Sequence, residues 1–250
     1  MTMKKIILIT ALAVGLFAQN SLAIAKKSYE VVSGYISSKS QTTMILKNAQ
    51  GVKNTRKLEI NKLENNDGDK LSLLFLYPND IKGTKLLSLE MIGKDDKQWL
   101  YLPALKRTKR ISSRNKSGSF MASEFSYEDI SSQNYKNYIY DDIVEKVIKN
   151  NNEYFKLTRA PKDRNSGYSK QIVYIDTKTY LARFGEYYDR QNKLLKNISF
   201  FDYKKIDGVY RVGKIEIKNV QNGKSSILVW DIDKIKVGLK NRMFSKRALQ

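Results

Sequence analysis

The chain has 250 residues, 41% of them hydrophobic, so it is long enough to bury one sizeable core. Its 46 Lys and Arg outnumber 25 Asp and Glu, and the net charge of +21 points to an anionic partner such as nucleic acid, a membrane surface or an acidic ligand. Cys and His are both absent, which excludes disulfides, thiolate sites, the usual general base of hydrolases and the commonest zinc ligand. We therefore expect a binding protein with no catalytic residues, no metal and no cofactor.

The N-terminus predicts a secretory signal peptide. Two lysines precede the apolar run 6–18, which is shorter than the ~20 residues needed to span a bilayer. Small residues at positions suited to cleavage follow: Ser21, Ala23 and Ala25. We expect cleavage after Ala23, with Ala25 as the alternative, so that residues 1–23 are removed and residues 24–250 form a single domain in the periplasm. Nucleic acid is then not an expected partner, and no nearby cysteine could carry a lipid anchor.

The mature chain begins with a helical pattern and continues as strands. A short amphipathic helix is predicted over Ser28 to Ile36, because Tyr29, Val32 and Ile36 share one helical face and Ser28 can cap its start. Beyond it, apolar residues alternate with a period of two, and Asn, Asp and Gly turns separate the runs. About ten strands in a meander predict one large, strongly curved antiparallel sheet or barrel. The clearest strands are Leu71 to Tyr77, Leu87 to Met91, Lys170 to Ile175, Leu181 to Tyr188, Leu194 to Tyr203, Gly213 to Val220 and Ser225 to Ile232.

Some of these strands are apolar on both faces. Trp99 and Tyr101 alternate with Leu100 and Leu102. An antiparallel sheet usually has one solvated face, so something must cover the second face. The sequence leaves open whether this cover is an ordinary protein layer or a bound ligand.

The segment Ser113 to Ile130 interrupts the strand pattern. Gly and Ser occur early in it, and Ser126 and Asp129 have the spacing of a capping box at the start of a short helix. Its Phe and Met residues supply an apolar side. The segment is either a lid over the sheet or a surface crossover that plugs one end of a barrel.

A run of basic residues follows the strand Trp99 to Leu102, which is apolar on both faces. These residues are either a rim that meets anionic groups or the solvated face of a strand and loop, and Arg107 or Arg110 could instead reach inward to the lid backbone or a buried acid. The candidates for rim or partner contact are Lys106, Arg107, Lys109, Arg110, Arg114 and Lys116.

The stretch WLYLPALKRTKRISSRNKSGSFMASEFSYEDI, residues 99–130, resembles the signature of the outer-membrane lipoprotein-sorting family of LolA-like periplasmic proteins. Further stretches resemble that family in the same order, and the resemblance covers essentially the whole mature chain. They are YFKLTRAPK at 154–162, YSKQIVYID at 168–176, EYYD at 186–189, IDGVYR at 206–211 and MFSKRAL at 243–249.

The resemblance implies a mainly β fold, an unclosed antiparallel β-barrel whose concave apolar face is lidded by a small helical segment, similar to LolA and LolB. It implies a carrier that shelters acyl chains of lipoproteins or other lipids and moves them between an inner-membrane complex and the outer membrane, with transient contact to anionic membrane surfaces. Our candidates for the apolar cavity or its lid are Leu87, Leu89, Trp99, Leu100, Tyr101, Leu102, Phe120, Met121, Phe125 and Tyr127.

Two other classes of function compete with a carrier. A periplasmic adaptor of a membrane transporter would use the same charged rim without lipid cargo. An enzyme would have to use carboxylate clusters such as Asp95-Asp96, Asp141-Asp142 or Asp231 with Asp233. None of these has an evident catalytic partner in the sequence, so we favour a carrier over an enzyme.

Overall fold

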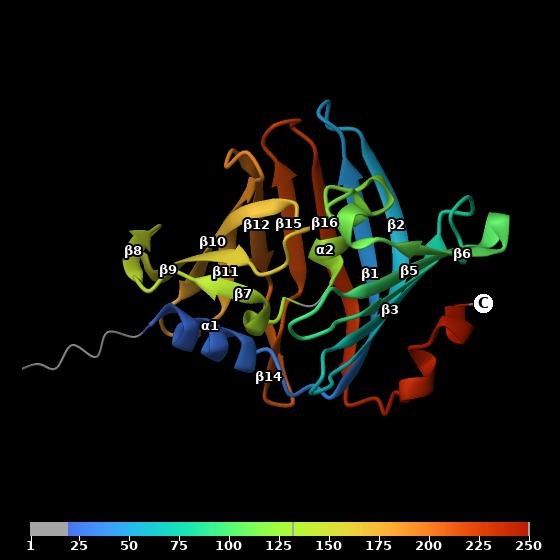
Figure 1. Cartoon of the computed structure of the whole chain (residues 1–250), viewed down its shortest axis with the longest axis horizontal. Coiled ribbons are helices and arrows are strands. Elements are labelled where there is room, and N and C mark those ends of the chain that lie inside the picture. Colours follow the sequence, from blue (N-terminus) through green and yellow to red (C-terminus); the bar gives the residue numbers. More distant parts are fainter. Residues whose placement is uncertain (1–19, 132, 250) are drawn as a thin grey trace, which may run out of the picture.

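The computed structural model describes residues 20–131 and 133–249, and most of the expected signal peptide lies outside them. A single antiparallel sheet of fourteen strands dominates the described chain, in the order β6-β5-β4-β3-β2-β1-β16-β15-β12-β11-β10-β9-β7, with β8 also paired to β9 (Figure 1). The terminal strands β6 and β7 do not pair with each other, so the curved sheet stays open. The predicted unclosed antiparallel β-barrel is confirmed.

The strands before the lid are β1 (Ser37–Lys47), β2 (Lys53–Leu63), β3 (Lys70–Tyr77), β4 (Lys85–Leu89), β5 (Lys97–Leu102) and β6 (Arg107–Ile111). Those after it are β7 (Tyr138–Tyr140), β8 (Glu145–Lys149), β9 (Asn152–Pro161), β10 (Tyr168–Asp176), β11 (Ala182–Asp189), β12 (Leu194–Phe201), β15 (Lys214–Asn219) and β16 (Ser225–Ile235). A separate hairpin joins β13 (Lys204–Ile206) to β14 (Val209–Arg211). The strands predicted from period-two alternation are all present, with small shifts at their ends.

The N-terminal helix differs from the prediction. Helix α1 spans Ser21–Glu30 and is capped by Asn20, whose side chain accepts a hydrogen bond from the amide of Ala23 at 2.7 Å. The predicted helix over Ser28 to Ile36 is wrong beyond its first residues, because Gly34 and Ile36 have φ angles of 93° and 60°, in the left-handed region that ends a helix. Ile24 and Ala25 of α1 are buried against Leu157 and Val173 of the sheet.

The main core lies on the concave face of the sheet. It contains alternate residues of β2, β3 and β4, such as Leu58, Leu73 and Leu86, and it is closed by Phe120 and Phe125 from the segment between β6 and β7. That segment contains the short helix α2 (Tyr127–Ile130) and several 3₁₀ turns, and it crosses in front of the sheet in Figure 1. We call residues 112–131 the lid.

The C-terminal segment covers part of the convex face. Two 3₁₀ turns, Asn241–Met243 and Lys246–Leu249, run beside the β3 to β6 side of the sheet (Figure 1). Phe244 and Leu249 are buried there against Leu87, and Trp99 and Tyr101 pack around them. The second apolar face of these strands is therefore covered by protein. Among the described residues, no helix is long and apolar enough to cross a membrane.

Candidate functional site

A cavity of about 330 Å³ lies between the concave face of the sheet, helix α1 and the lid. This volume is at the lower end of the ~300–1,000 Å³ typical of small-molecule sites. Apolar side chains from all three parts face it. They include Leu71, Phe125, Ile130, Leu157, Ile198 and Leu228. A space of this kind shelters an apolar ligand from water at little cost.

The cavity also has a polar side. Tyrosines from α1, the following loop and the later strands line it, among them Tyr29, Tyr35 and Tyr210. Burial raises the pKa of Tyr35 well above its usual value, so this phenol remains neutral at physiological pH. Four cations line the same cavity: Lys62, Lys70, Arg159 and Arg211. Its lining thus combines an apolar floor with a few hydrogen-bonding and charged groups, as ligand sites usually do.

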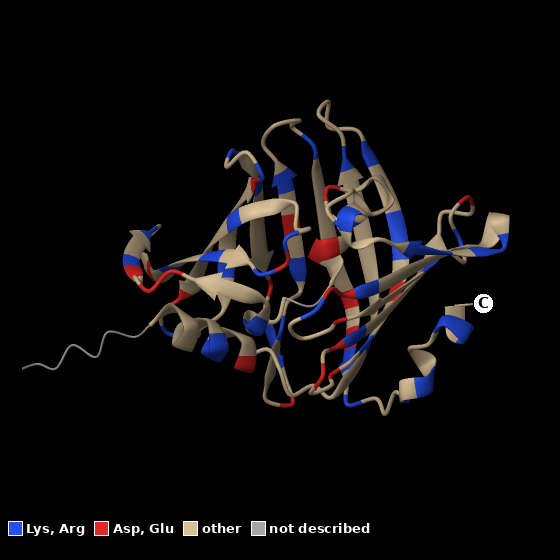
Figure 2. Cartoon of the chain, in the orientation of Figure 1, with Lys and Arg blue, Asp and Glu red and all other residues tan. Residues whose placement is uncertain are grey.

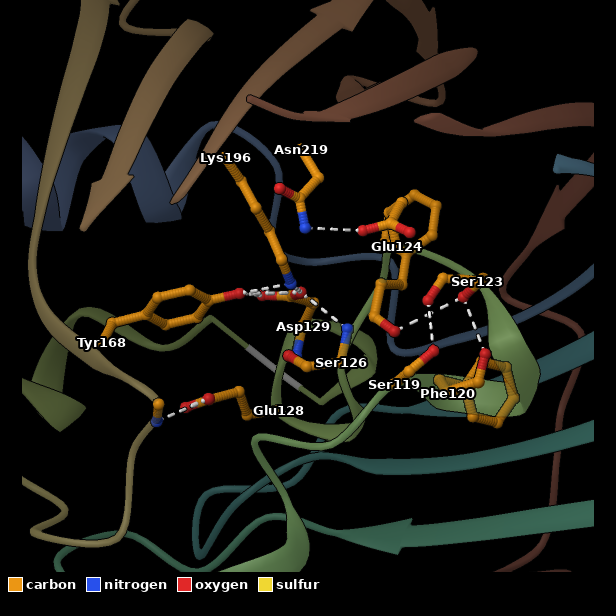
Figure 3. A network of polar contacts seen from close by, with 12 residues as sticks. Ser119, Phe120, Ser123, Glu124, Ser126, Glu128, Asp129, Tyr168, Lys196 and Asn219 are labelled. Carbon is orange, nitrogen blue, oxygen red and sulfur yellow. Dashed lines mark hydrogen bonds and ion pairs between the residues drawn. The ribbon is translucent and has the colours of Figure 1, made fainter. Parts of the chain in front are cut away.

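The lid is held to the sheet by a buried polar network (Figure 3). The Ser126 hydroxyl accepts a hydrogen bond from the Asp129 amide, and the Asp129 carboxylate accepts one from the Ser126 amide, which is the predicted capping box at the start of α2. The Asp129 carboxylate also accepts hydrogen bonds from the Tyr168 hydroxyl at 2.8 Å and the Lys196 ammonium at 3.0 Å. The Lys196 and Asp129 side chains are only 8% and 4% exposed, so this is a buried ion pair. The Tyr168 hydrogen bond thus fixes α2 to β10, and the Lys196 ion pair fixes it to β12.

Further contacts anchor the rest of the lid. The Glu128 carboxylate accepts bonds from the Ser166 hydroxyl at 2.7 Å and the Gly167 amide at 2.8 Å. Burial, followed by the charge of Asp129, raises the pKa of Glu128. Glu124 accepts a bond from the Asn219 side chain at 2.8 Å, which ties the lid to β15 (Figure 3).

The centre of the lid has a strained backbone that a side chain of the sheet supports. Met121 and Ala122 have φ angles of 49° and 61°, which non-glycine residues seldom adopt. The Arg56 guanidinium on β2 donates a hydrogen bond to the Met121 carbonyl. Phe120, the residue before this turn, is fully buried and packs edge-on against Tyr127 at 5.4 Å between ring centroids.

The sequence-predicted cavity residues divide between the two faces of the sheet. Phe125 lines the cavity. Leu100, Phe120, Leu102, Met121 and Tyr127 belong to the concave core next to it. Leu87, Leu89, Trp99 and Tyr101 point to the convex face and pack against the C-terminal segment. The division follows from strand alternation, because Leu87 and Leu89 face opposite to Leu86 and Ser88.

The sequence-predicted cations also divide. Lys106, Arg107, Lys109, Arg110 and Arg114 are exposed on or beside the edge strand β6. Lys116 is half-buried and forms an ion pair with Asp163, which ties the lid to the loop before β10. The inward bond to the lid backbone comes from Arg56 and not from Arg107 or Arg110. Figure 2 shows that Lys and Arg are spread over many strands and loops, so β6 is one basic region among several.

Sequence reasoning missed the cavity tyrosines and the cavity cations Lys62, Lys70, Arg159 and Arg211. A signal for Lys62 was present, because Leu58, Ile60 and Lys62 alternate along one face of β2. No comparable signal exists for Arg211, which reaches the cavity from the separate β13–β14 hairpin. Of the carboxylates weighed for an enzyme, Asp233 pairs with Arg211 and Asp231 accepts a hydrogen bond from the Thr43 hydroxyl.

Comparison with known proteins places the chain in a family. Residues 67–250 match a family described as uncharacterized proteins. A crystal structure of an outer membrane lipoprotein-sorting protein domain from Vibrio parahaemolyticus is 41% identical to this chain, with a TM-score of 0.87, and the match covers 91% of this chain and 97% of that domain. The chain belongs to the outer-membrane lipoprotein-sorting protein family.

Two further solved structures have a similar fold. A DUF1329 family protein from Desulfovibrio piger is 28% identical with a TM-score of 0.86, and the match covers 92% of this chain and 98% of that protein. A LolA superfamily protein from Nitrosomonas europaea is 17% identical with a TM-score of 0.76, over 92% of this chain and all of that protein, and it shows the shared fold alone. No curated protein sequence matches the chain. The lipoprotein-sorting family member described here thus has the LolA superfamily fold.

Proposed function

We propose that this protein is a periplasmic carrier that binds acyl chains of a lipoprotein or another lipid in the lidded cavity. The main support for this proposal is the cavity, which is lined by apolar side chains from the sheet, α1 and the lid. Each buried methylene contributes about 0.8 kcal/mol to binding, so an extended acyl chain gains several kcal/mol there. In this proposal residues 24–250 act as one binding domain after a signal peptide is removed.

The lid gives the carrier a means of loading and release. Polar contacts hold it at separate points along the sheet, at Glu124, Glu128 and Asp129. Loading from an inner-membrane transporter and delivery to an outer-membrane acceptor would each require these contacts to exchange with a partner. The exposed cations of β6 are candidates for contact with such a partner or with an anionic bilayer surface.

Filling the cavity tests the proposal. Ala182 lines the cavity, so Ala182→Trp should occupy part of the space and weaken binding of a fluorescent fatty-acid probe at least about tenfold. Ala104→Trp is the control, because Ala104 is exposed between β5 and β6. Lipid copurifying with the wild-type protein should be detected by native mass spectrometry. A folded wild-type protein that binds neither probe nor lipid would favour the adaptor.

A further inference from the structure

A lysine side chain lies on the concave face of the sheet, inside the proposed lipid cavity. On β2, Leu58 and Ile60 point inward and are buried, and Lys62 is the next residue on that face. Lys62 lines the cavity together with Ile60 and Leu71. The inward positions of this strand therefore change from apolar to cationic at Lys62.

Lys62 has no hydrogen-bond or ion-pair partner among residues 20–131 and 133–249. The neighbouring cation, Arg211, is occupied, because its guanidinium donates to both Asp233 oxygens at 2.7 and 3.3 Å and to the Ser38 hydroxyl at 3.3 Å. Asp69 and Asp233 attract the Lys62 ammonium, but neither forms an ion pair with it.

An unpaired lysine in this position destabilises the folded protein when no ligand is bound. Burial, reinforced by the charge of Arg211, lowers the pKa of Lys62, while Asp69 and Asp233 oppose the shift. The Lys62 side chain is half-buried, so its unpaired ammonium loses part of its hydration without a compensating bond, whereas Met at this position would fill a similar space without that loss. The Asp69 carboxyl does not offset it fully, since burial raises the pKa of Asp69 and disfavours its charged form.

We propose that Lys62 binds the anionic headgroup, a carboxylate or a phosphate, of the amphiphile whose acyl chain occupies the cavity. The proposal rests on the proposed carrier function and adds the chemical class of its ligand. The Lys62 ammonium donates to the headgroup, and the tail lies against Ile60, Leu71 and Leu228 on the apolar part of the lining. A charge-assisted hydrogen bond in a low-dielectric site is about twice as strong as a neutral one, which favours an anion over an uncharged ester.

Displacement of a fluorescent fatty-acid probe by three lipids with the same 16-carbon chain tests this assignment: palmitate, 1-palmitoyl lysophosphatidate and the neutral 1-monopalmitoylglycerol. At least one anionic lipid should displace the probe from the wild-type protein at about tenfold lower concentration than the glycerol ester. Lys62→Met should remove most of that preference and leave displacement by the glycerol ester nearly unchanged. Lys57→Met is the matched control, because Lys57 is exposed on the opposite face of the same strand.

Each outcome decides a separate question. The better of the two anions identifies whether the site is shaped for a carboxylate or a phosphate. Equal displacement by charged and neutral lipids in the wild-type protein overturns the headgroup proposal while the carrier proposal stands. A preference that persists in folded Lys62→Met assigns the anion to another cation and also overturns it. Failure of all amphiphiles to bind overturns the carrier proposal itself.

Discussion

Lys62 lowers the stability of the ligand-free fold, and we propose that it strengthens binding of an anionic ligand. Because burial lowers its pKa, the folded protein holds the Lys62 proton less tightly than the unfolded chain does. The resulting destabilisation is full below the folded-state pKa and disappears as pH rises to the unfolded value of about 10.4. Lys62→Met should therefore raise the free energy of unfolding at neutral pH, on the order of 1 kcal/mol, and the gain should vanish near pH 10.4.

Urea denaturation at pH 7 and pH 10.4 measures this difference, with Lys57→Met as the reference. A Lys62→Met protein less stable than the wild type at neutral pH would show that the ammonium has a stabilising partner and is not held for a ligand. The prediction belongs to the ligand-free protein, so lipid must be removed before the measurement.

At the same scale, Lys196 neutralises the buried Asp129 carboxylate. Lys196→Met should lower the free energy of unfolding by about 3 kcal/mol, because it leaves that carboxylate without its cation. The double variant Lys196→Met with Asp129→Asn should recover part of the loss, since Asn still caps α2 and carries no charge. Urea denaturation of the two single variants and the double variant checks this. Strictly additive losses would mean that the two side chains do not interact.

The edge strand β6 and the turns beside it contain the exposed cations that the sequence singles out. If they meet an anionic surface, neutralising Lys106, Arg107, Lys109 and Arg110 together should weaken binding to anionic vesicles, each charge contributing about 1 kcal/mol. Wild-type binding should itself decline as salt shortens the screening length to ~10 Å at 0.1 M. The melting temperature should hardly change, because exposed charges contribute ~0–1 kcal/mol per pair.

Vesicle sedimentation and thermal unfolding of the same quadruple variant separate the two interpretations of this strand. The matched control neutralises four exposed lysines elsewhere: Lys53, Lys57, Lys146 and Lys178. An equal loss of vesicle binding in both variants would show that total charge, and not β6, drives association. Unchanged binding in the β6 variant would leave these residues as a solvated strand edge.

Helix α1 bears on where a signal peptide can be removed. Ile24 and Ala25 are buried against β9 and β10 and help form the floor on that side of the molecule. Cleavage after Ala25 would remove the buried side chains of Ile24 and Ala25, whereas cleavage after Ala23 keeps them and removes the first turn with its Asn20 cap and the buried Ser21. If the predicted signal peptide is removed, this packing favours cleavage after Ala23 over cleavage after Ala25.

Over the whole molecule, the sheet separates two apolar layers with different roles. The concave layer surrounds the cavity, and the convex layer packs beneath the C-terminal segment. Phe244 is only 4% exposed, so Phe244→Ala should cost about 3 kcal/mol of stability. In a Trp230→Phe background, where Trp99 is the remaining tryptophan, the same change should shift the fluorescence towards the red. Probe binding should be unchanged, because Phe244 lies on the face opposite the cavity. Loss of binding in the folded variant would instead place the ligand on the convex face.

The regularity of the fold was predictable because alternation is a local property of the chain. Leu71, Leu73 and Phe75 mark the inward face of β3 in the sequence itself, and Ser126 with Asp129 marks the start of α2. Strand β1 left a weaker signal, because its inward positions Ser38, Ser40 and Thr42 are polar yet buried. The Ser40 hydroxyl donates a hydrogen bond to the Ile60 carbonyl on the neighbouring strand, 20 positions along the chain. Local pattern cannot anticipate such a bond.

From the sequence alone, periodicity and turn chemistry predicted a strongly curved antiparallel sheet or barrel and the capping box of α2, because both act over a few residues. That the sheet is unclosed was implied by the resemblance to the lipoprotein-sorting family, and whether residues 113–130 form a lid or a surface crossover stayed open. Only the tertiary structure decided which apolar face encloses the cavity and which side chains reach it. Alternation shows that Trp99 and Leu100 point to opposite faces, but the identity of each face depends on the distant C-terminal segment that covers one of them. Likewise, the isolation of Lys62 depends on Asp233, 171 positions further along the chain, being already paired with Arg211.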